Sequence, residues 1–227
     1  MMNRSFSTPI RKTLTAIAFS CSLAATMTTT MTQAAEIEMS FQNVLQQERA
    51  WAGLQSKTLK VGDITWSYSE GGQVGKPIVV LIHGLAGSRD NWNRVANALT
   101  GNYHVIIPDL PASGETQVPK EFDYSVPNVT EKLRRFIEAA NLTGPAHIAG
   151  HSLGGSIAML YAGQYPFETK SLFLVDAAGV YKAGNTPYLK DPNQIRSMIV
   201  SKKGDFNFLM QQAMHNPPFI PKEIAQA

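Results

Sequence analysis

The sequence contains one cysteine in 227 residues, Cys21. A single thiol cannot form an intramolecular disulfide, which excludes the small folds that depend on several disulfides for their stability. Hydrophobic residues make up 44% of the chain, which at this length is enough to bury a substantial core. We therefore expect a globular protein that is stabilised by its core and not by cross-links.

Acidic residues are absent from the first 35 positions, whereas three basic residues occur there: Arg4, Arg11 and Lys12. An apolar stretch follows from Leu14 to about Met27, and Thr32–Ala34 has the small-x-small pattern of a cleavage site. The stretch is shorter than the roughly 20 residues needed to span a bilayer. We expect residues 1–35 to be a signal peptide and the mature protein to be exported, to the periplasm or outside the cell.

The same segment accounts for the net charge and for the only thiol. The formal charge of +3 equals the number of basic residues in it, so the rest of the chain is neutral overall. A neutral mature chain gives no reason to expect a nucleic-acid partner. An alternative to secretion is that Cys21 carries a lipid anchor, because it follows the small residue Ser20 and precedes a threonine-rich stretch.

Short apolar runs, typical of strands buried on both faces, alternate with amphipathic stretches of helical length. The runs are PIVVLIHG, YHVIIPD, PAHIAG and SLFLVDAAG, and the helices are expected over about 90–99, 126–140 and 153–164. Before them, residues 57–72 alternate like an antiparallel strand pair, and residues 37–54 have the spacing of a helix that packs on the core. The pattern predicts a doubly wound, mostly parallel α/β sheet.

The pattern changes after Asp176, where helical spacing continues over residues 191–201 and 205–214 without a strand between them. The region from Met198 to Phe219 is rich in methionine and phenylalanine, which suits either an apolar pocket or simple packing. We expect residues 36–184 to form the N-terminal part of the core and residues 185–227 to form part of a helical cap.

The segment HIAGHSLGGSIAML places Ser152 between a predicted strand and a predicted helix. Gly150 and Gly154 flank this serine in a G-x-S-x-G pattern, which permits a turn too tight for side chains on either side. Such a turn exposes the hydroxyl at the positive end of the helix dipole, where negative charge is stabilised. The alternative is that Ser152 only caps the helix.

The segments LIHGLAGSRDNW, PDLPASGET and GHSLGG together resemble the α/β-hydrolase superfamily over about residues 58–227, in particular secreted bacterial lipases and esterases. The resemblance implies that Ser152 is the nucleophile and that the backbone amides of Leu85 and Leu153 form the oxyanion hole. It also implies that His83 and Gly84 support the oxyanion loop. No metal or other cofactor is implied, and Ala112 replaces a glycine that the family usually has.

The family places its acid and its histidine after the serine, on loops that follow later strands. Here only 51 residues follow Asp176, and they have helical patterns without the two strands that the family has there. His215 is the one histidine after the predicted serine helix, and its setting favours a surface role. Asp176 is a candidate for the acid, although a structural carboxylate is the alternative. We expect a truncated hydrolase, with a shortened relative without catalytic activity as the alternative.

The resemblance therefore predicts hydrolysis of apolar acyl esters through an acyl-enzyme, on a small-molecule or lipid ester, with transient contact with a lipid surface. Other chemistry of the same fold stays open: hydrolysis of carbon–carbon bonds or serine haloperoxidase-like activity. A non-catalytic exported binding protein is a further alternative. The oligomeric state and the length of the acyl chain stay open as well.

Overall fold

The computed structural model describes residues 39–142, 144–179, 204–213 and 215–216. The predicted signal peptide, Cys21 and the predicted helix over residues 191–201 lie outside these residues. The chain divides into two compact units, Met1–Ala177 and Ala178–Ala227, which are described separately. This division falls near the predicted boundary between core and cap at residue 184.

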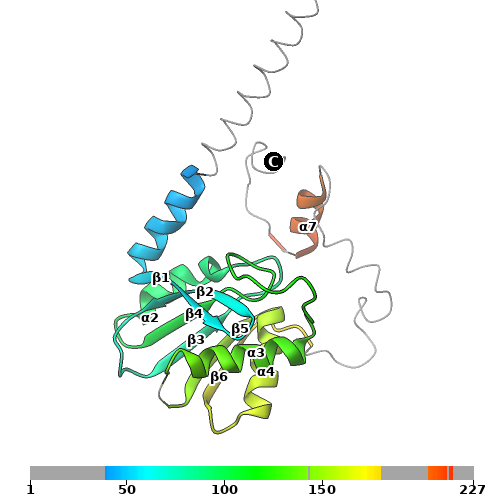
Figure 1. Cartoon of the computed structure of the whole chain (residues 1–227). Helices are drawn as coiled ribbons and strands as arrows, with labels where there is room; N and C mark the ends of the chain where they lie inside the picture. The colour runs from blue at the N-terminus through cyan, green and yellow to red at the C-terminus, as the bar shows by residue number, and fades with distance from the viewer. Residues whose placement is uncertain (1–38, 143, 180–203, 214, 217–227) are drawn as a thin grey trace, which may run out of the picture. The chain divides into compact units, whose positions relative to one another are not determined.

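Six strands form one sheet in the first unit (Figure 1). They are β1 (Leu54–Val61), β2 (Ile64–Gly71), β3 (Ile78–Ile82), β4 (His104–Pro108), β5 (Ala146–His151) and β6 (Thr169–Val175). The order is β1-β2-β4-β3-β5-β6; β2 pairs antiparallel with both β1 and β4, and the other neighbouring strands pair in parallel. The predicted antiparallel pair and mostly parallel sheet are confirmed.

The helices of this unit connect the parallel strands. A 3₁₀ turn, η1 (Arg89–Trp92), leads into α2 (Asn93–Leu99) between β3 and β4. The helix α3 (Val126–Ala139) precedes β5, and α4 (Leu153–Gln164) follows it. Figure 1 shows α3 and α4 together in front of the sheet, whereas α2 lies behind it. This doubly wound arrangement agrees with the predicted fold class.

The alternation of side chains along β3 divides the core into two clusters, one on each face of the sheet. Val80 and Ile82 belong to a cluster that includes residues of α3 and α4, whereas Val79 and Leu81 pack with residues of η1 and α2. All four are at most 6% exposed. Because successive side chains of a strand point to opposite faces, a run without polar residues is required where helices cover both faces.

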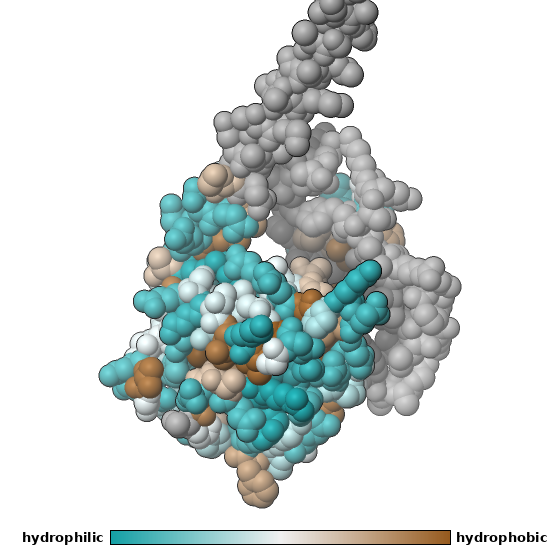
Figure 2. Space-filling model, in the orientation of Figure 1, coloured by the Kyte–Doolittle hydropathy of each residue, from teal (hydrophilic) through white to brown (hydrophobic). Residues whose placement is uncertain are grey.

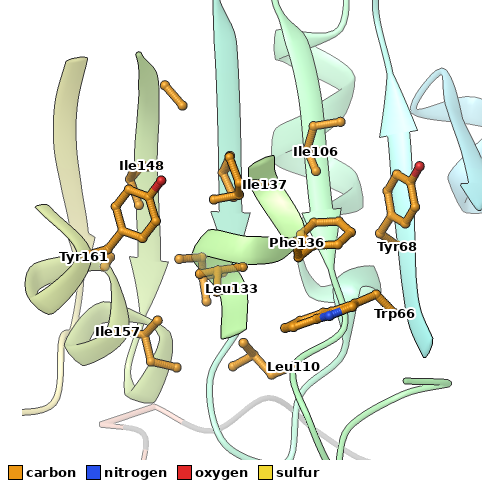
Figure 3. Packing of buried hydrophobic residues seen from close by; sticks show 14 of the residues in the cluster. Trp66, Tyr68, Ile106, Leu110, Leu133, Phe136, Ile137, Ile148, Ile157 and Tyr161 are labelled. Carbon is orange, nitrogen blue, oxygen red and sulfur yellow. The ribbon is translucent and has the colours of Figure 1, made fainter. Parts of the chain in front are cut away.

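Phe136 of α3 occupies the centre of the first cluster (Figure 3). Its ring lies 4.9 Å from that of Trp66 and 5.2 Å from that of Tyr68, measured between centroids, and the second pair meets edge to face. Phe136 and Trp66 are completely buried. These contacts join α3 to β2, so the antiparallel start of the sheet is fixed to the parallel part. The opposite side of α3 faces outward, and the surface in this view is largely hydrophilic (Figure 2).

Residues 39–51 are helical, as predicted, but most of their apolar side chains face outward. Phe41 is 55% exposed, Val44 50% and Trp51 59%. The prediction that this apolar face packs on the core is therefore wrong. The helix is held instead by polar contacts: Arg49 donates two hydrogen bonds of 2.6 Å to the carboxylate of Asp90.

The strand β6 forms one edge of the described sheet. Leu172, Phe173 and Leu174 in its centre are 39%, 64% and 36% exposed. The apolar run is typical of a strand buried on both faces, and its exposure is what the expected truncation predicts for this strand. The second unit contains α7 (Asp205–Ala213), which agrees with the predicted helix over residues 205–214.

Candidate active site

Ser152 forms the turn between β5 and α4. The strand ends at His151 and the helix begins at Leu153, so Ser152 is the only residue between them. Its φ of 52° and ψ of −117° are rare for a residue with a side chain. The backbone N–H of Ser152 donates to the carbonyl oxygen of Val175 at 3.1 Å, which ties the turn to the end of β6. The strained conformation is thus held from outside the turn.

Three glycines allow this turn to close. A Cβ at Gly150 would lie 2.2 Å from the carbonyl oxygen of Gly154, and a Cβ at Gly154 would lie 2.3 Å from that of Ile82. The sequence predicts these two positions. It does not predict Gly155, where a Cβ would lie 2.5 Å from the Cβ of Ala177. The doubled glycine in the segment is the signal that could have indicated this third contact.

The side chain of Ser152 does not cap α4. Ser152 occupies the N-cap position, but its hydroxyl makes no capping hydrogen bond. The first turn of the helix is closed by its carbonyl oxygen, which accepts hydrogen bonds from Gly155 N at 2.9 Å and Ser156 N at 3.2 Å. The hydroxyl therefore does not cap the N-terminus of the helix. It lies where the helix dipole stabilises negative charge.

The loop after β3 passes directly beside this serine. A Cβ at Gly84 would lie 3.0 Å from both Ser152 Cβ and His151 Nδ1. A side chain at this position would fit only if its neighbours shifted by a few tenths of an ångström. The loop then turns at Ala86, which has φ 55°, and Gly87 N donates to Gly84 O at 3.2 Å.

His83 fixes this loop through both ring nitrogens. The backbone N–H of Leu110 donates to Nε2 at 2.9 Å, so Nε2 carries no proton. Nδ1 then carries the proton and donates to Gly84 O at 2.8 Å. The side chain is buried, and burial lowers the pKa of His83 below the ordinary value of 6.5. A neutral imidazole with both nitrogens engaged supports the loop and is not free to take a proton from Ser152.

The two predicted oxyanion donors are the backbone amides of Leu85 and Leu153. Within the described residues, neither Leu85 N–H nor Leu153 N–H donates to a protein acceptor. The side chain of Leu85 is 73% exposed, and only its backbone N–H is predicted to act in the site. Leu153 is the first residue of α4, where an N–H has no acceptor within the helix.

The candidates for the acid and the base are not joined to Ser152 in the described part of the chain. Asp176 directly follows β6 and adopts φ 45°, next to the residue that binds Ser152 N. His215 belongs to the second unit. Among the described residues, no histidine is hydrogen-bonded to the Ser152 hydroxyl.

A cavity of about 260 Å³ lies beside the turn. It is lined by His83, Asn91, Trp92, Val95, His151 and Val175. Trp92 is 6% exposed, and its Nε1 has no hydrogen-bond partner in the described residues. The exposed surface of the cavity is therefore largely apolar, and two of its lining residues, His151 and Val175, belong to the ends of β5 and β6.

The described residues contain no cluster of three or more side chains of the types that bind metal ions: histidine, cysteine, aspartate and glutamate. None of the helices in that part of the chain has the length and apolar character required to cross a bilayer.

Residues 77–218 match the profile of the alpha/beta hydrolase fold family. The chain belongs to this family. It is 37% identical over 186 residues to Lipase 3 of Moraxella sp. (strain TA144), a match that covers 81% of this chain and 58% of the lipase. The chain thus spans little more than half the length of this relative.

Two crystal structures resemble this hydrolase-fold chain closely. A candidate lipase (lip1) from Acinetobacter baumannii AYE is 75% identical, with a TM-score of 0.77, over 82% of this chain and 62% of that protein. A membrane phospholipase A described as a bacterial virulence factor is 31% identical, with a TM-score of 0.75, over 95% of this chain and 68% of that protein.

Proposed function

We propose that the full-length protein is a serine carboxylic-ester hydrolase of the lipase or esterase type. The proposal depends mainly on the conformation of Ser152, which is held at φ 52° on a strand-to-helix turn with its hydroxyl free of any capping role. Strained backbone conformations are typical of active sites, and this turn exposes the hydroxyl so that it can attack a substrate. The names of similar proteins support the same reading, since they include lipases and a phospholipase.

In the proposed reaction, Ser152 Oγ attacks the ester carbonyl carbon while a general base takes the hydroxyl proton. The negative oxygen of the tetrahedral intermediate accepts hydrogen bonds from the amides of Leu85 and Leu153. The protonated base gives its proton to the leaving alkoxide, which departs as the alcohol and leaves an acyl-enzyme. Water, deprotonated by the same base, then attacks the acyl carbon and releases the carboxylic acid and free Ser152. His83 is excluded as the base because both of its nitrogens are engaged. We assign the activity to the full-length protein, since no described histidine is hydrogen-bonded to the Ser152 hydroxyl.

The proposed substrates are uncharged esters with an apolar acyl group, from small esters to lipids. The similarity to lipases supports this class, and so does the largely apolar wall of the cavity beside the turn. We also propose transient contact with a lipid surface, because lipid esters are presented there. No residue of the chain is proposed to hold a cofactor.

A fluorophosphonate probe tests the proposal directly, because it reacts with activated serines. The full-length protein is expected to be labelled on Ser152, and Ser152→Ala is expected to abolish both labelling and hydrolysis of p-nitrophenyl butyrate. Ser156→Ala, one turn further along α4, serves as the matched control and should react like the wild type. Absence of labelling in a folded wild-type protein would favour a binding protein instead.

A series of p-nitrophenyl esters from acetate to palmitate then separates the substrate classes. A maximum of kcat/KM at long acyl chains identifies a lipase, and a maximum at two to four carbons identifies an esterase. A labelled protein that hydrolyses none of these esters would have a different reaction of the same fold.

We further propose that the protein is exported. Expression from the native start in a Gram-negative host, followed by mass spectrometry of the N-terminus, distinguishes the two routes. A mature protein that begins near Glu36 supports signal cleavage, whereas a diacylglyceryl adduct on Cys21 that is lost in Cys21→Ala supports a lipid anchor. An uncleaved chain in the cytoplasm would contradict both.

A further inference from the structure

We infer that Arg89 is a positioning residue for the oxyanion hole and that it acts through a buried ionic network with Asp109 and Glu115. The inference rests on the proposed function, because it concerns the loop that carries Leu85. We call these three residues the Arg89 network.

The centre of the network is an ion pair removed from water. The side chains of Arg89 and Asp109 are each 1% exposed, and Arg89 Nη1 donates to Asp109 Oδ2. The backbone N–H of Arg89 donates to the other carboxylate oxygen, Asp109 Oδ1, at 2.7 Å. Arg89 Nη2 binds Glu115 Oε2 at 2.6 Å. One guanidinium therefore joins two carboxylates, and one carboxylate holds both the side chain and the main chain of Arg89.

The network determines where the oxyanion loop ends. The loop leaves β3 at His83 and enters η1 at Arg89, so Leu85 lies between these two residues. At the first end of the loop, the backbone N–H of Leu110 donates to His83 Nε2. At the second end, the backbone N–H of Arg89 donates to Asp109 Oδ1. The two residues that make these hydrogen bonds, Asp109 and Leu110, are adjacent in the chain. One short segment that follows β4 therefore fixes both ends of the loop that carries the Leu85 amide.

This segment is itself fixed to the sheet. Thr116 Oγ1 donates to Asp109 O at 2.8 Å and accepts from Ser67 N of β2 at 3.0 Å. Glu115 N donates to Asp109 Oδ2 at 3.1 Å, an approach that depends on Gly114, where a Cβ would lie 2.2 Å from the Asp109 carboxylate. The rigid sheet thus holds Asp109, and Asp109 holds Arg89.

Lysine cannot replace Arg89 in this role. An ammonium group is a single point charge, whereas the planar guanidinium presents donors in two directions at once. Arg89→Lys retains the positive charge that Asp109 requires but cannot bind Asp109 and Glu115 together with the same geometry. The chain is expected to fold, with the oxyanion loop displaced. A displacement of about 1 Å at a reacting group reduces the rate by about 100-fold.

The test is the rate of labelling by a fluorophosphonate in full-length wild type, Arg89→Lys and Glu115→Ala. The phosphoryl oxygen of this probe occupies the oxyanion hole during the reaction. We expect the maximal labelling rate of Arg89→Lys to fall at least about 10-fold, with the concentration for half-maximal rate changed less than about 3-fold. Glu115→Ala removes the ion pair between Arg89 and Glu115. Because the Glu115 side chain is more than half exposed, the variant should fold, with a smaller fall in the labelling rate.

Arg94→Lys on α2 is the matched control, because it makes the same exchange at an exposed arginine outside the network. It should label at the wild-type rate. Melting temperatures measured on the same samples separate positioning from folding. If Arg89→Lys and Glu115→Ala are folded and both label at the wild-type rate, Arg89 has only a structural role and the inference is overturned. If the wild type itself is not labelled, the proposed function fails first, and the two failures are thus distinguished.

Discussion

Gly84 and Ser152 are 68 positions apart in the sequence, yet a Cβ on Gly84 would lie 3.0 Å from the Cβ of Ser152. The oxyanion loop and the candidate nucleophile are therefore in direct contact. Parallel pairing of β3 with β5 brings them together, because Ile82 and Gly150 are partners in that register. The chain after each of these adjacent strand ends carries one half of the site.

Gly84→Ala tests this contact. The added methyl group would press on Ser152 and on the exposed side chain of His151, which can turn away. We expect a modest loss of stability, about 1–3 kcal/mol, and a fall of about 100-fold in the labelling rate of the full-length protein. Denaturant unfolding and labelling kinetics measure the two effects. Gly101→Ala is the control, since a Cβ there has no atom within 4 Å. A fully active Gly84→Ala protein would show that the contact is not critical.

Gly154→Ala should be much more damaging than Gly163→Ala, although both residues lie in α4. A Cβ on Gly154 would lie 2.3 Å from Ile82 O and 2.4 Å from His83 O, and neither main-chain atom can move without displacing β3. We expect a loss of more than about 3 kcal/mol. A Cβ on Gly163 has open space, so helix propensity should stabilise that variant by up to about 1 kcal/mol. Equal midpoints in urea for the two variants would contradict the reported packing.

The stability of the protein should fall as the pH decreases below about 6.5. Burial lowers the pKa of His83 in the folded state, so the unfolded chain binds a proton that the folded chain does not. The contribution of His83 to the free energy of unfolding is fully present above its pKa in the unfolded chain, 6.5. This contribution is lost as the pH falls from that value toward the lower pKa in the folded state. The slope contributed by one such proton is at most about 1.4 kcal/mol per pH unit.

Urea unfolding between pH 5 and 7.5 measures this slope in the wild type and in His83→Gln. The variant retains a polar group near Leu110 N but cannot be protonated, so its slope should be smaller. The carboxylate of Glu70, whose pKa is lowered by Lys57 and His104 despite its burial, loses its contribution only as the pH falls below about 4.5, outside this window. Identical slopes would show that His83 is not the titrating group.

The edge formed by β6 should cause this 227-residue chain to self-associate when it is expressed by itself. Exposed, apolar edge strands pair with other chains, and Phe173 is 64% exposed at the centre of this edge. Phe173→Lys is expected to increase the soluble monomeric fraction in sedimentation velocity experiments. Phe167→Lys is the control, because Phe167 is 96% exposed but lies in the turn before the strand. Equal effects of the two variants would point to general hydrophobicity, and a monomeric wild type would refute the prediction.

The sequence by itself determined the elements of the sheet and the location of the turn. Alternation along residues 57–72 predicted the β1–β2 pair, and the helix after Ser152 begins and ends where its spacing indicates. These features are local, because side-chain periodicity and glycine spacing act between residues that are close in the chain. Gly150 and Gly154 could be assigned for the same reason.

Only the tertiary structure decided which distant groups meet. Arg89 looks like an ordinary loop arginine in the sequence, and its burial depends on Asp109 at the end of a neighbouring strand. Gly155 is required because of Ala177, and Phe41, Val44 and Trp51 face outward although their spacing predicts packing. A pattern in the chain indicates that an apolar or charged face exists. What covers that face is set by strand order and crossover connections, which bring together residues that no local pattern relates.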